Sequence, residues 1–183
     1  MQRPLRILYI TPIIFGKTIF AHARMNLARE FIKRGFSFRF IAPFSPSATE
    51  TLTENDLDFQ LFPWRDFPGL STLTKSGGAV QALKSSIPDF LPDIIISELR
   101  ISTRKMLEMT KHLGEQGPLW IIDDRSPPVM GGPLGKLQLA HYDYIVPKLM
   151  QSANAIIVQN HQHEQFLVDR FNCSFPKFIH CGG

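Results

Sequence analysis

The strongest constraint on the fold is a regular alternation of short apolar runs with segments of helical period. The run Leu5–Ile10 is almost continuously β-forming and stops at Thr11 and Pro12, as is typical of a strand buried on both faces of a parallel sheet. Apolar residues then recur at helical spacing from Phe20 to Ile32, and Gly35 follows at the position that favours a helix C-terminus. The pattern continues along the chain, so the sequence predicts alternating strands and helices.

The later segments extend this pattern to the end of the chain. We expect strands over 36–42, 58–64, 93–97, 119–123 and 155–158, a strand-to-glycine ending over 178–183, helices over 79–87 and 102–113, and an amphipathic helix after Asn160. The segment 66–76 is predicted as a loop, Pro88 and Pro92 as the end of the preceding helix, and Pro147 as a break in a further helix. The predicted fold class is therefore α/β, a Rossmann-like doubly wound parallel sheet with right-handed crossovers.

Composition and charge narrow the range of partners. The chain has 183 residues, and its 20 Lys and Arg against 16 Asp and Glu give a net charge of +4. The basic residues are scattered, which argues against nucleic acid as a partner. A mild positive field suits phosphate-bearing substrates or an anionic membrane surface, and an ordinary solvated surface also explains it.

The cysteines and the apolar segments bear on location. Cys173 and Cys181 provide neither a disulfide framework nor a zinc-binding spacing, which favours a cytoplasmic setting. The start of the chain has some features of a secretory signal, but Pro12 interrupts its apolar run and the helical pattern continues past the matching cleavage site. No stretch approaches the roughly 20 apolar residues of a membrane span. Membrane contact is therefore expected to be peripheral, on the inner face.

A phosphate-binding turn is one interpretation of the loop after the first strand. Gly16, Lys17 and Thr18 precede a helix, where backbone N–H groups and the helix dipole favour an anion. A Walker A loop would need glycine at the position of Thr11, and Pro12 lacks an N–H inside the cradle. A phosphate-binding enzyme that uses Lys17 stays an alternative, as does a plain loop glycine at Gly16.

Charged residues follow the fourth and fifth predicted strands, where ligands collect in open parallel sheets. Asp123, Asp124, Arg125 and Ser126 come directly after the fifth strand. Neighbouring carboxylates can shift one another's pKa values, and an arginine can pair with a phosphate or carboxylate. The alternative is a structural Asp–Arg pair that holds the loop. Glu98 and Arg100, after the fourth strand, raise the same two possibilities.

The histidines do not predict a metal site. His161 and His163 are two residues apart and do not share a helix face, so we expect no metal there. Asn160 is predicted to cap this helix, with Glu164 in its first turn. Whether His22 and His141 face the cleft is left open by the sequence.

Four segments of the chain match a known pattern: Arg6–Pro12, Asn26–Phe36, Ala153–Asn160 and Phe175–Gly183. Together they resemble the N-terminal domain of group 1 glycosyltransferases, and the last is similar to the segment that joins the two halves of that family's GT-B fold. Each motif is loose, but the four occur in the family's order. The resemblance implies that residues 1–183 form the N-terminal Rossmann-like lobe of a two-domain enzyme, whose C-terminal donor-binding domain is absent from this chain.

The resemblance also implies an activity. The full enzyme would transfer a sugar from a nucleotide-sugar donor, with retention and without a metal or cofactor, to a saccharide or lipid-linked acceptor. This half would bind the acceptor and be inactive alone. The assigned catalytic residues are Asp124 and Arg125, which orient the acceptor, and the assigned substrate-binding residues are Gly16, Lys17, Thr18, Glu98, Arg100, Asp123 and Ser126.

Two departures from the family pattern are present. The family's first loop has adjacent glycines, whereas Gly16 is followed by Lys17 in this chain, and segment 123–128 lacks the histidine that many members carry. A non-catalytic saccharide- or phosphate-binding module with the same fold is the alternative function.

Overall fold

The computed structural model describes residues 3–15, 19–45, 57–66, 71–111, 113, 117–125, 131–172 and 177–181. The elements are β1 (Arg6–Ile10), α1 (Ile19–Lys33), β2 (Ser37–Pro43), β3 (Asp58–Phe62), α3 (Ser71–Phe90), β4 (Ile94–Glu98), α4 (Thr103–Lys111), β5 (Leu119–Asp123), α5 (Gly132–Met150), β6 (Ala155–Val158), α6 (His161–Phe171) and β7 (Phe178–His180). The strands form one parallel sheet in the order β3-β2-β1-β4-β5-β6-β7. The predicted α/β doubly wound fold is confirmed.

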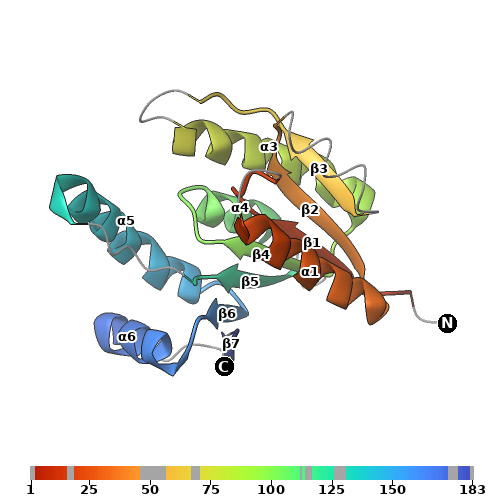
Figure 1. Cartoon of the computed structure of the whole chain (residues 1–183). Helices are drawn as coiled ribbons and strands as arrows, with labels where there is room; N and C mark the ends of the chain where they lie inside the picture. Colours follow the sequence, from red (N-terminus) through yellow and green to blue (C-terminus); the bar gives the residue numbers. More distant parts are fainter. Residues whose placement is uncertain are drawn as a thin grey trace.

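Helices cover both faces of the sheet (Figure 1), and the alternation of side chains along the strands divides the core into two layers. Ile7 and Tyr9 of β1 pack with α1 on one face of the sheet, in a cluster rich in phenylalanine. Leu8 and Ile10 belong to the larger cluster on the other face, which includes buried residues of α3, α4, α5 and α6. Successive side chains of a strand point to opposite faces. Each residue at a strand end therefore lies either on the α1 side of the sheet or on the side of the other helices.

Helix α1 ends just before Gly35, as the sequence predicts. Gly35 has a φ of +86°, and its N–H bonds to the carbonyl of Ile32 at 2.9 Å. The N–H of Phe36 bonds back to Phe31 at 3.1 Å. A glycine adopts this left-handed conformation at little cost, which turns the chain directly into β2.

Two helices differ from their predicted extents. The segment predicted as a loop over 66–76 is helical from Ser71, and Pro88 lies inside α3 rather than ending it. Likewise α5 begins at Gly132, within the glycine-rich segment, and continues through Pro147. Pro133 falls in the first turn of α5, where a missing N–H costs nothing. The buried residues Ile145, Val146 and Leu149 hold the last turns of α5 against the sheet despite Pro147.

The helices of the described residues include none that is both long and apolar enough to cross a membrane.

Candidate functional site

The carboxyl ends of β1, β4 and β5 bring Tyr9, Glu98 and Asp123 together on the α1 side of the sheet. Glu98 and Asp123 are direct partners in the β4–β5 register, and Tyr9 pairs with Ile96 of β4. Both carboxylates are buried, with exposed fractions of 9% for Glu98 and 3% for Asp123. Burying charge is costly unless it is paired, so the partners of these two groups determine what the site can do.

Hydroxyl groups supply the first set of partners. The phenol of Tyr9 donates a hydrogen bond to Asp123 Oδ2 at 2.5 Å and lies 3.4 Å from Glu98 Oε1. Thr11 Oγ1 donates to the same Glu98 oxygen at 3.0 Å. Burial, with the charges of Asp123 and Glu98, raises the pKa of Tyr9 far above its usual range. Tyr9 therefore stays protonated and acts as a hydrogen-bond donor.

Arginines supply the second set of partners. Arg24 of α1 places Nε 3.0 Å from Glu98 Oε1 and Nη2 4.0 Å from Asp123 Oδ2. Arg125 binds both oxygens of Asp123, at 2.7 and 2.6 Å, and Arg100 Nη2 lies 3.5 Å from Glu98 Oε2. Burial disfavours the charged form of Arg125, but its hydrogen bonds to Asp123 and the charge of that carboxylate outweigh this and raise the pKa of Arg125. Three guanidinium groups face two carboxylates, so this side of the site is positive.

Asp124 lies in different surroundings from its neighbour. Its Oδ2 accepts a 2.5 Å hydrogen bond from the phenol of Tyr142 on α5 and lies 3.5 Å from His163 Nε2 on α6. Burial and the charge of Asp124 raise the pKa of Tyr142 far above its usual range, so Tyr142 donates. The backbone N–H of Gln159 points to His163 Nδ1 at 3.5 Å, which turns Nε2 toward Asp124. The carboxylate thus links β5 to two helices.

These groups surround a cavity of about 620 Å³. Its wall includes all five described candidate residues, Glu98, Arg100, Asp123, Asp124 and Arg125, together with Arg24 and the α5 residues Gln138, His141 and Tyr142. His141 Nε2 is buried and has no hydrogen-bond partner in the described part of the chain. A buried polar atom without a partner is costly, and here it lines a space in which a ligand can supply that partner.

A smaller cavity of about 190 Å³ lies on the β1 and α3 side and shares Thr72, Glu98 and Arg100 with the larger one. Lys75 of α3 is part of its wall. Burial lowers the pKa of Lys75. Glu98 and Arg100, joined across 3.5 Å, therefore stand between two spaces.

The predicted site residues fall into two groups. Glu98, Arg100, Asp123, Asp124 and Arg125 converge on the larger cavity, and the anticipated Asp–Arg pair is present between Asp123 and Arg125. Gly16, Lys17, Thr18 and Ser126 lie outside the described residues. Asn160 caps α6 as predicted, since its Oδ1 accepts from the His163 N–H at 2.9 Å.

Sequence reasoning missed Tyr9, Arg24 and Tyr142, and it left His141 undecided. Arg24 and Tyr142 reach the site from helices, where a polar residue is usually a surface residue. Their one signal was position: Arg24 lies in the first turns of the helix after β1, and Tyr142 near the middle of the helix after β5.

Comparison with known proteins adds information about the fold. No family model matches the sequence, and no curated protein matches it. Among solved structures, a glycosyltransferase from Rickettsia africae ESF-5 has a TM-score of 0.64 at 12% identity, covering 99% of this chain and 43% of that one. Sucrose-phosphate synthase from Thermosynechococcus elongatus has a TM-score of 0.63 at 13% identity, with 98% and 48% covered.

A third similar structure is Anabaena Alr3699/HepE, solved in complex with UDP and glucose. Its TM-score is 0.57 at 14% identity, with 98% of this chain and 45% of that one covered. The chain thus spans about half the length of these structures. At such identities the similarity concerns the fold alone. It agrees with the resemblance seen in the sequence: the chain has the Rossmann-like α/β fold of one lobe of the GT-B glycosyltransferases.

Proposed function

We propose that the chain is the acceptor-binding, N-terminal half of a glycosyltransferase that takes a sugar from a nucleotide-sugar donor. The observation that carries the proposal is the 620 Å³ cavity at the carboxyl ends of β4 and β5, with three arginines in its wall and the buried Nε2 of His141, which has no hydrogen-bond partner among the described residues. Ligands bind at this edge in open parallel sheets. The similarity of almost the whole chain to half of several glycosyltransferases supports the same function.

The wall of the cavity suits a hydroxylated acceptor that carries negative charge. His141 Nε2 would pair with an acceptor hydroxyl and gain the partner that it lacks among the described residues. Arg100, whose side chain is 44% exposed, would meet the phosphate of a lipid-linked acceptor or an acidic group of a saccharide.

We assign the catalytic role to Asp124 and Arg125, which line the cavity beside His141. Tyr142 occupies Oδ2 of Asp124, so Oδ1 is the atom that we assign to an acceptor hydroxyl. Asp123 holds the Arg125 guanidinium at two of its five N–H groups, and the other donors would orient the acceptor. Both roles are positional: they hold the attacking hydroxyl in place while the donor is presented.

The donor would be held mainly by a second half outside this chain. UDP and glucose are bound by the similar Anabaena protein, and we extend nucleotide-sugar binding to the complete enzyme. Its diphosphate charge would be offset by helix N-termini and basic side chains, without a metal in the transfer step and without a cofactor. Retention of the anomeric configuration is part of the same proposal.

We infer a cytoplasmic location with peripheral contact to the inner face of the membrane. Leu137 and Tyr144 of α5 are 67% and 59% exposed, and Lys148 lies 3.2 Å from the centre of the Tyr144 ring. Apolar and basic side chains that share a helix suit an anionic lipid surface. Cosedimentation with vesicles containing phosphatidylglycerol should fall when Leu137 is replaced by Ser.

The decisive test uses the complete protein, with its C-terminal half, and a panel of nucleotide sugars. The donor should raise the thermal midpoint, and sugar transfer should follow once an acceptor is added. We expect His141→Ala to raise the KM for the acceptor about tenfold, the equivalent of one lost hydrogen bond. His22→Ala, at an exposed position of α1, is the matched control and should leave the KM unchanged.

Two outcomes would contradict the proposal. Saturable binding of a saccharide without transfer from any donor would identify a non-catalytic binding module. An unchanged acceptor KM in His141→Ala would place the acceptor outside the cavity.

A further inference from the structure

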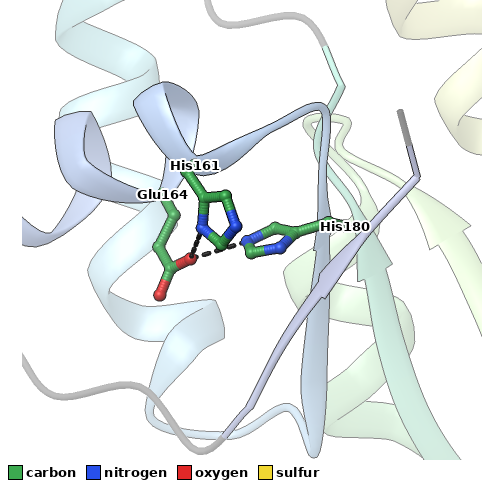
Figure 2. A group of neighbouring side chains, drawn as sticks. All are labelled: His161, Glu164 and His180. Carbon is green, nitrogen blue, oxygen red and sulfur yellow. Dashed lines mark hydrogen bonds and ion pairs between the residues drawn. The ribbon is translucent and has the colours of Figure 1, made fainter. Parts of the chain in front are cut away.

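A group of metal-ligating side chains lies outside the cavity, where the first turn of α6 meets β7 (Figure 2). His180 Nε2 is 2.6 Å from Glu164 Oε2, and His161 Nδ1 is 3.5 Å from the same oxygen. The two imidazole rings have their centres 3.9 Å apart at an angle of 70°. One potential ligand atom from each residue lies within 4.8 Å of the others. Two histidines and a carboxylate thus converge on one point.

Local structure fixes this convergence from both sides. Asn160 caps α6, and the three-residue spacing of His161 and Glu164 places them on one face of its first turn. His180 is paired with Val158 in the β6–β7 register, and the Cys181 N–H bonds to the Val158 carbonyl at 3.1 Å. His180 is therefore held by the sheet, whereas its two partners are held by a helix.

The chemistry of the group favours a divalent transition metal. Two imidazoles directed at one carboxylate oxygen offer nitrogen lone pairs, which Zn²⁺ accepts in tetrahedral sites made of two His and one Glu. Zn–N bonds of roughly 2.0–2.1 Å put neighbouring ligand atoms about 3.3 Å apart, close to the separations of 2.6 and 3.5 Å within this group. The His161 side chain is 86% exposed, so solvent can reach the ion and fill a fourth position.

We propose that His161, Glu164 and His180 bind Zn²⁺. The ion fastens the first turn of α6 to β7, two elements that meet here through the contacts of His180 with Glu164 and His161. His163, two residues after His161, points instead toward Asp124 in the cavity. The ion therefore stiffens the helical turn that also supports Asp124, and it has no step in the proposed sugar transfer.

The test is a calorimetric titration of the metal-free chain with ZnCl₂, carried out in the presence of excess Mg²⁺. We expect one Zn²⁺ per chain and a rise in thermal midpoint. Both His161→Ala and His180→Ala should weaken binding at least about tenfold. Because His161 is exposed, its replacement leaves the fold intact, so a loss of affinity there reports on ligation. His22→Ala is the control for an exposed histidine elsewhere.

A second measurement identifies the ligand atoms. Co²⁺ bound in place of Zn²⁺ should give visible absorption bands that His161→Ala changes and Cys181→Ser does not. Absence of stoichiometric binding, full affinity in both histidine variants, or loss of binding only in Cys181→Ser would each overturn the proposal. The titration needs neither donor nor acceptor, so its outcome is independent of the proposed transferase activity.

Discussion

Asp123 and Asp124 are adjacent in sequence, yet they belong to opposite sides of the sheet and are stabilised by different chemistry. Asp123 faces α1, where Arg24 and Arg125 surround it. Asp124 faces α5 and α6, where a phenol and an imidazole approach one of its oxygens. Arginine stays charged at all physiological pH values, whereas the partners of Asp124 are a neutral phenol donor and an imidazole ring. Asp123, on the α1 side, is therefore stabilised mainly by permanently charged partners, and Asp124, on the other side, mainly by hydrogen bonding.

Removal of a guanidinium from the α1 side should have the largest effect. Arg24 and Glu98 are both 11% exposed at the side chain, and loss of one partner leaves a buried charge uncompensated. We expect Arg24→Met to lower the free energy of unfolding by about 3 kcal/mol, measured by urea denaturation. The double variant Arg24→Met, Glu98→Gln should recover much of this loss. A decrease below about 1 kcal/mol in the single variant would show that Arg100 and Thr11 suffice for Glu98.

Removal of one tyrosine hydroxyl from each side of the sheet sharpens the comparison between Asp123 and Asp124. Tyr142→Phe should cost about 2 kcal/mol, because Asp124 keeps only the more distant His163 among its described side-chain partners. Tyr9→Phe should cost about 1 kcal/mol, since Arg125 still binds both oxygens of Asp123. The order of the two losses in denaturant melts is the measurement. The reverse order would mean that the arginines do not protect Asp123.

The smallest effect is expected at the surface pair that joins α5 to α6. Arg170 binds both oxygens of Asp143 at 2.5 and 2.7 Å, and these hydrogen bonds lower the pKa of Asp143 below its ordinary value of 3.8. Both side chains are about one third exposed, so Asp143→Asn should cost only about 0.5 kcal/mol.

The pH dependence of this pair follows from the direction of the pKa shift. A carboxyl whose pKa is lowered on folding stabilises the protein above its unfolded pKa, and that contribution disappears as pH falls through the folded value. The difference between the natural chain and Asp143→Asn should therefore be constant near neutral pH and vanish in acid, as the pH falls through the lowered pKa of Asp143. A difference that persists there would point to packing rather than charge.

The sequence predicted the sheet because its signals are local. Runs such as Leu5–Ile10 and the glycine at 35 determine their own conformation. The extents of α3 and α5 could not be predicted in the same way, because local rules end a helix at Pro88 or Pro147, whereas burial against the sheet keeps it intact. Tertiary packing outweighed local propensity at both prolines.

The site was predictable where residues lie at strand ends. Glu98 and Asp123 follow from the position of the strands alone, since the ends of parallel strands share one edge. Arg24 and Tyr142 reach that edge from helices, and His180 meets His161 from another strand. Such contacts depend on how the helices and strands pack, and the residue spacing within a single segment does not predict that packing. The opposite directions of His161 and His163, in contrast, follow from helical period and were predicted.

Glu98 and Arg100 form a partition between the two cavities. A ligand in one cavity that binds Arg100 withdraws that positive charge from the other cavity. It also weakens the contact between Arg100 and Glu98. Ligand binding in one cavity is thereby thermodynamically coupled to ligand binding in the other. An anion in the smaller cavity would therefore compete with an anion in the larger one for the same guanidinium.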